Sequence, residues 1–179
     1  MNYVIKEKFG PGSEDWEDYA RWAGLEHCQE YCSIDGVVSK NLFTPKSAED
    51  WGNCVNADFK LHLLTNLDFA RKCARKHNRA EILGAIEDPK SSRESIPARH
   101  MLVGYDIIDV HNSISLLTDR GGRDTIADLT LNKFALLEDM DDAYQLKGQL
   151  RQDYPDDDHA SECEVWAVYK LDVQAPPDL

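Results

Sequence analysis

Apolar positions along the chain change their spacing several times, and the longest strand-like apolar run covers 101–111. Both alternating faces of this run are largely apolar, which is typical of a strand covered on both sides. Alternation of apolar and polar residues predicts two further strands, over 57–65 and 163–173, and we also expect a short edge strand over 3–5. The segment 81–86 fits either a strand or the continuation of a helix.

Helical spacing of apolar residues predicts helices over 67–79, 126–134 and 140–153, and shorter ones after Ser13 and Pro45. Several connections between the predicted strands are too short for parallel crossovers. The expected fold class is therefore α+β, with a mixed or mostly antiparallel sheet of about four to five strands and four or five helices packed on it.

A length of 179 residues favours a single globular domain, taken as 1–174, followed by a frayed tail over 175–179. The first residues lack the apolar stretch of a signal peptide, and nowhere do 18 apolar residues follow one another. Five cysteines, an odd number, indicate free thiols in a reducing compartment. We therefore expect a cytoplasmic protein.

The formal charge is strongly negative, because 33 acidic residues outnumber 20 basic ones and give −13. Such a field repels nucleic acid and anionic membranes, and it attracts a basic protein partner. We therefore expect binding to neither nucleic acid nor membrane. Solubility alone is the other explanation of the charge. One basic face runs against the trend, formed by Arg71, Lys72, Arg75, Lys76, His77 and Arg79.

The end of the 101–111 run carries the candidate catalytic residues Asp109 and His111. Residues two apart in a strand point to the same face, so a carboxylate there can orient the imidazole as a general base, or both can share a metal. Asp106 points to the opposite face. The alternative is that Asp109 and His111 mark where the strand leaves the core and meets water.

A candidate anion site follows this strand, formed by Arg120, Gly121, Gly122 and Arg123. Backbone amides in a Gly-Gly turn can bind an anion, and two arginines would assist. The segment matches neither of the established phosphate-loop motifs. A glycine pair that permits positive φ is the alternative explanation.

Three thiols and one imidazole are residue types that bind zinc. They are His27, Cys28, Cys32 and Cys54. The paired spacing of zinc-binding motifs is missing, and buried thiols on a helix explain the same pattern. We therefore predict no bound metal and no cofactor.

Acidic residues cluster at both ends of the 140–153 helix. The cluster after the helix, Asp156, Asp157 and Asp158, is a candidate surface for a basic partner. Trp166 is a second candidate, because alternation places it on the outer face of its strand, where it needs a helix or a partner over it.

These features favour a small acidic protein that acts by protein–protein binding, as an inhibitor or immunity-type protein for a basic partner. In size and acidity the chain is similar to small bacterial proteins that neutralise toxins by binding them. One alternative is a hydrolase or metal-dependent enzyme that uses Asp109 and His111. Another is a structural domain that forms homo-oligomers.

Overall fold

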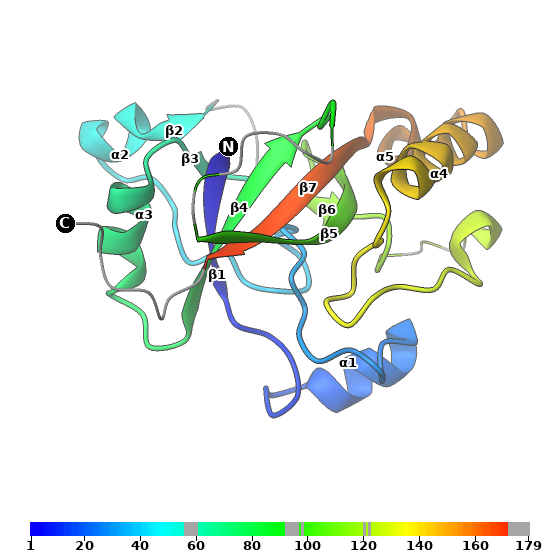
Figure 1. Ribbon diagram of the computed structural model, residues 1–179, viewed down its shortest axis with the longest axis horizontal. Helices are drawn as coiled ribbons and strands as arrows, with labels where there is room; N and C mark the ends of the chain where they lie inside the picture. Colours follow the sequence, from blue (N-terminus) through cyan, green and yellow to red (C-terminus); the bar gives the residue numbers. More distant parts are fainter. Residues whose placement is uncertain (56–60, 92–96, 98, 120, 122, 172–179) are drawn as a thin grey trace.

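The computed structural model describes residues 1–55, 61–91, 97, 99–119, 121 and 123–171, and it combines a curled antiparallel sheet with helices at its periphery (Figure 1). The strands are β1 (Asn2–Glu7), β2 (Cys54–Val55), β3 (Leu63–Leu64), β4 (Ala80–Glu87), β5 (His100–Asp109), β6 (Ile114–Ser115) and β7 (Glu164–Leu171). The helices are α1 (Trp16–Ala23), α2 (Ala48–Gly52), α3 (Leu67–Ala74), α4 (Met140–Asp153) and α5 (Asp158–Glu162), with a 3-10 turn at Asp124–Ile126.

The strands lie in the order β2-β3-β1-β4-β7-β5-β6, and each neighbouring pair is antiparallel. The expected α+β class is confirmed, but the expected strand number was wrong, because the described residues already form a sheet of seven strands. Three of them, β2, β3 and β6, are two residues long, too short to produce an alternating pattern in the sequence.

Helices α4 and α5 cover one end of the sheet, α2 and α3 the other, and α1 lies below (Figure 1). Helix α4 places Ala143, Leu146 and Leu150 in the core against strands β5 and β7. Asp139 caps its first turn, accepting hydrogen bonds from the backbone N–H groups of Asp141 and Asp142. Within the described residues, no helix combines the length and apolar character that crossing a bilayer requires.

Strand β1 is an interior strand, between β3 and β4, whereas an edge strand was expected over 3–5. Lys6 of this strand is buried, and its ammonium donates to the backbone carbonyls of Asp35 and Ser39. The ambiguous segment 81–86 is part of β4, at the middle of the sheet. Alanine, leucine and glutamate favour a helix, but pairing with a neighbouring strand on each side stabilises the extended conformation of this segment.

The expected helix over 126–134 is wrong, because only the 3-10 turn forms there. The side chain of Asn132 accepts hydrogen bonds from the backbone N–H groups of Phe134 and Leu136. It also donates to the carbonyl of Val103, at 2.8 Å. These bonds replace the helical ones. Of the other expected elements, part of the 57–65 strand and the whole 175–179 tail lie outside the described residues.

The segment that follows Asn132 lies against strand β5, where Leu137 and Tyr105 exchange two backbone hydrogen bonds of 2.8 and 3.0 Å. Gly104 makes this approach possible, since it has φ +148° and a Cβ placed on it would lie 2.6 Å from the carbonyl oxygen of Leu137. The glycine in this strand therefore serves a close backbone contact.

Candidate functional site

Asp109 is the last residue of β5, and its side chain is almost fully buried at 1% exposure. It accepts hydrogen bonds from the backbone N–H groups of His111 and Asn112 and from the Asn112 side chain. Burial acts to raise the pKa of this carboxyl, but the hydrogen bonds from His159 and Asn112 outweigh it and hold the pKa below its usual range. Asp109 is thus an ionised carboxylate with its geometry fixed.

The imidazole that pairs with Asp109 belongs to His159 in α5, with Nδ1 2.5 Å from Oδ2. The structure does not bring Asp109 and His111 together as expected. The strand ends at Asp109 and a turn follows, so strand alternation no longer applies at His111. The His111 ring instead lies 3.7 Å from a carboxylate oxygen of Glu162, on the surface. An Asp–His pair exists, but its histidine comes from 50 residues further along the chain.

Arg123 faces inward, although it was expected to bind an anion. Its guanidinium binds the carboxylate of Asp157 at 2.7 and 2.9 Å and donates to the backbone carbonyl of Asp119. Asp157 in turn caps α5. Two predicted binding residues therefore neutralise each other inside the protein. Gly121 has φ 53°, in keeping with a turn that needs positive φ. The other two residues of the predicted anion site, Arg120 and Gly122, lie outside the described residues.

Trp166 is 2% exposed and belongs to the core, so the expected partner surface at this residue is not present. Ile34 and Leu136, from the segments that cross this face of the sheet, belong to the same apolar cluster. The tryptophan was expected to need a helix or a partner over it, and segments of its own chain cover it instead. Asp156 and Asp158 are exposed, whereas Asp157 is engaged with Arg123.

The candidate zinc residues are not assembled into one site. Cys28 and His27 are neighbours, with Sγ and Nε2 3.6 Å apart, and Cys28 packs in the cluster beneath α1. Cys32 belongs to a different apolar cluster, and Cys54 lies on β2 at the edge of the sheet. The thiols are buried, but not on a helix as the alternative explanation assumed, because 27–34 forms no helix.

A buried polar network, which the sequence pattern did not indicate, connects the segment after α1 to β5 and β6. Tyr31 donates to the carboxylate of Asp35 and lies 2.7 Å from the hydroxyl of Thr118. Asp106 is fully buried, and Ser115 donates to its Oδ1 at 2.6 Å. Burial disfavours the charged form of both ionisable groups. It raises the pKa of Asp106 to about 6 and lowers the pKa of Lys6 to about 8.

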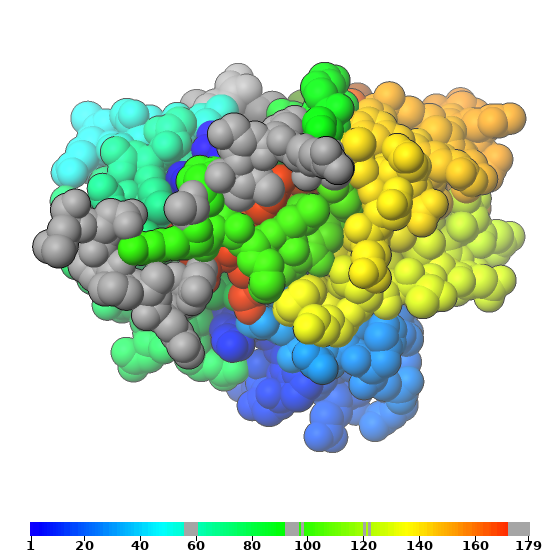
Figure 2. Space-filling view, viewed as in Figure 1, coloured from blue at the N-terminus to red at the C-terminus, as the bar shows by residue number. Residues whose placement is uncertain are grey.

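Charge is unevenly distributed along the chain. Residues 100–179 contain 17 acidic and six basic residues, whereas residues 1–99 contain 16 and 14. Most of residues 123–162 lies at the end of the molecule that carries α4 and α5, and we call the surface of these residues the acidic end (Figure 2). Its exposed acidic residues are Asp124, Asp128, Glu138, Asp139, Asp141, Asp142, Asp153, Asp156, Asp158 and Glu162.

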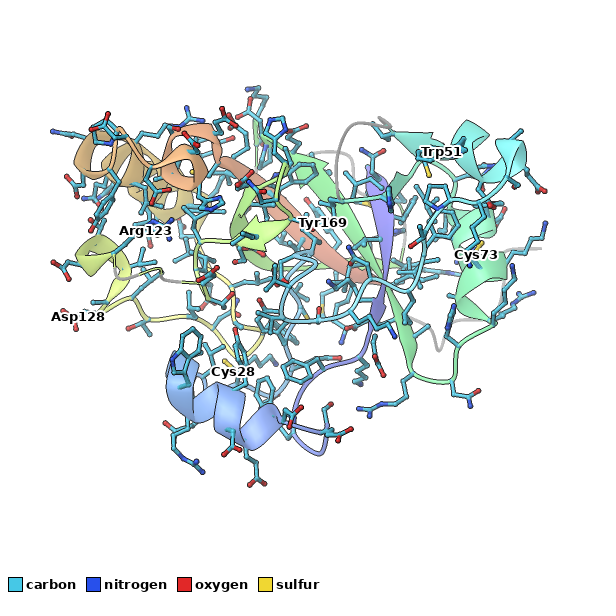
Figure 3. All side chains as sticks on the ribbon, turned by 180° about the vertical axis from the view of Figure 1, so that it is seen from behind. Cys28, Trp51, Cys73, Arg123, Asp128 and Tyr169 are labelled. Atoms are coloured by element: carbon cyan, nitrogen blue, oxygen red, sulfur yellow. The ribbon has the colours of Figure 1, made fainter. Side chains whose placement is uncertain are left out.

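Most lysine and arginine residues within the acidic end form ion pairs with carboxylates of the same chain. Besides Arg123, both Lys147 and Arg151 bind the carboxylate of Glu164. The exposed carboxylates therefore keep their excess negative charge. Figure 3 shows Arg123 and Asp128 at this end and Cys73, in α3, at the other.

The opposite end carries the basic residues of α3 and the turn after it. A shallow groove of about 420 Å³ lies there. Its lining residues are Glu7, Lys40, Leu42, Lys76, His77, Asn78 and Arg79. Arg79 donates to the Ser13 hydroxyl and the Lys8 carbonyl, and Lys72 pairs with Glu49. The basic residues of α3 thus lie at the end of the molecule opposite the acidic end.

No family model matches the chain, and neither curated proteins nor solved structures give a match.

Proposed function

We propose that this protein acts by binding a basic protein partner through its acidic end, in the manner of an inhibitor or immunity-type protein. The observation that carries the proposal is the set of exposed carboxylates on 123–162, where three of the four lysine and arginine residues, Arg123, Lys147 and Arg151, already pair with carboxylates. Long-range attraction to a positive surface raises the rate of association and selects against acidic competitors.

The test begins with capture of partners from a lysate of the source cells at low and at high salt. A partner held mainly by charge is retained at low salt and released at high salt. Its association and dissociation rates with the purified protein are then measured separately, because loss of steering changes mainly the association rate.

A charge-reversed variant combines Asp124→Lys, Asp128→Lys and Asp156→Lys, three exposed residues of the acidic end. We leave Asp157 unchanged because its pairing with Arg123 makes it part of the fold. The association rate is expected to fall by roughly tenfold or more at low salt, with a smaller change in the dissociation rate.

A matched control places the same three lysines on the α1 side of the molecule, as Glu14→Lys, Glu17→Lys and Glu26→Lys. Both variants carry a formal charge of −7 in place of −13. The control should associate much faster than the first variant. Equal rates for the two variants would show that the net charge, and not the acidic end, governs binding.

A second function is favoured by the Asp109–His159 pair. A buried carboxylate that holds one ring nitrogen can prepare the other to take a proton from water or a hydroxyl. His159 is 38% exposed, so its ring can reach solvent. We propose hydrolase activity as this alternative, tested on an activated ester. His159→Ala should abolish hydrolysis, whereas His111→Ala, on the neighbouring surface, should preserve it. Hydrolysis by wild type no faster than by buffer would refute it.

A further inference from the structure

Two carboxylates and a thiol lie close together between the segment that follows α1 and strand β4. Among the residues that the structure describes, one ligand atom each from Glu30, Cys32 and Glu81 lies within 4.8 Å of the other two. Glu30 and Cys32 are two apart on an extended segment, and Glu81 comes from the central strand β4. Three chemically suitable groups from distant parts of the chain thus converge.

The groups in this cluster are buried and incompletely bonded. Cys32 is 0% exposed and the side chain of Glu30 is 10% exposed. Both carboxylate oxygens of Glu81 are shielded from solvent without a hydrogen bond, whereas Oε1 of Glu30 lies 3.3 Å from the Lys8 ammonium. Buried carboxylate oxygens normally have partners, so this arrangement is costly as it stands.

Positive charge at the cluster comes from Lys170 on β7 and from Lys8. Lys170 binds Glu30 and lies 3.7 Å from Glu81, and Lys8 lies 3.3 Å from Glu30. The contact of Glu81 with a cation is thus longer than either contact of Glu30. Lys170 is 23% exposed, so its side chain has a path to solvent.

We infer that Glu30, Cys32 and Glu81 form a binding site for a thiophilic divalent cation of the Zn²⁺ class. A thiolate with carboxylates suits this class, whereas Ca²⁺ and Mg²⁺ require oxygen ligands alone. Ligands around tetrahedral Zn²⁺ lie roughly 3.3–3.8 Å apart, and the three ligand atoms here lie within 4.8 Å of one another. On binding, Cys32 loses its proton to solvent, and Lys170 turns outward, opening the fourth position.

The experiment uses Co²⁺, which replaces Zn²⁺ in such sites and, when bound to a thiolate, gives a charge-transfer absorption in the near ultraviolet. The reduced, metal-free protein is titrated with Co²⁺, and Zn²⁺ is then added. We expect one Co²⁺ per chain, the thiolate band, and its loss on addition of Zn²⁺. A wild-type protein that develops no band would overturn the assignment.

Variants identify the ligands. Cys32→Ser should lose the band, whereas Cys163→Ser, a change at an equally buried thiol in another cluster, should keep it. Glu81→Gln should weaken Co²⁺ binding although it leaves every cysteine in place. Lys170→Met should strengthen binding by roughly tenfold or more, because it removes a competing positive charge. A band that persists in Cys32→Ser, or unchanged affinity in Lys170→Met, would contradict the site.

Discussion

Asp106 offers a test of how strongly burial controls ionisation in this fold. Its carboxyl is fully buried, and one oxygen accepts hydrogen bonds from Ser115 and from the backbone N–H of Ile107. Burial, and secondarily the charge of Asp35, raises its pKa to about 6. We predict that Asp106→Asn, which cannot ionise, changes the pH dependence of stability.

The sign follows from the folded state's preference for the protonated carboxyl. The pKa is about 6 in the folded protein and about 3.9 in the unfolded chain. The stabilisation from proton binding is therefore complete below pH of about 4 and is lost as pH rises through about 6. These two pKa values give about 1.4 kcal/mol at pH 5 and almost none at pH 8.

Urea unfolding of the wild type and the variant at pH 5 and pH 8 measures this difference. The free energy of unfolding of Asp106→Asn, minus that of the wild type, should be about 1.4 kcal/mol higher at pH 8 than at pH 5. Asp157→Asn is the control: its carboxyl is paired with Arg123 and has a lowered pKa, so its effect should be the same at both pH values. An Asp106→Asn effect that does not change with pH would mean that the carboxyl is ionised inside the folded protein, contrary to the argument.

Three further changes test the packing by unfolding measurements. Gly104→Ala should destabilise the fold by about 2–4 kcal/mol because the new Cβ meets the neighbouring backbone, whereas Gly148→Ala, with open space around it, should be neutral or stabilising. Trp166→Ala should cost about 3–5 kcal/mol, and the same change at Trp22, 72% exposed, under about 0.5 kcal/mol; equal losses would refute the burial of Trp166. Arg123→Ala should cost about 1.5–3 kcal/mol by leaving its carboxylate partner unpaired, and a neutral result would show that the pair contributes nothing.

The sequence predicts best those elements whose pattern is local. The α4 helix follows from its apolar spacing and acidic cap, and β5 and β7 follow from alternation. The central position of β1 and β4 was not predictable in this way. Lys6 and Glu81 lie directly opposite each other in that pair, and each is a charged residue whose burial depends on partners remote in sequence.

The candidate sites were predictable to a smaller degree for the same reason. Asp109 was identified from its place at a strand end, but its histidine partner lies on a different element and no local spacing connects them. Arg123 and Asp157 were each assigned to external ligands because sequence spacing cannot show that they pair. The cluster of Glu30, Cys32 and Glu81 depends on the register of β4 beneath the covering segment.

The position of β7 has a consequence for the order in which the fold can form. β7 is the last strand in the described chain, yet it lies between β4 and β5 and pairs with both. During synthesis β4 and β5 therefore emerge before the strand that pairs with both of them. In the same way, β1 cannot pair with β4 until the chain beyond Ala80 has been made. Folding dominated by such distant pairings is slow. The growing chain thus exposes incomplete sheet edges until residues 164–171 emerge, so this period is when misassociation would compete with folding.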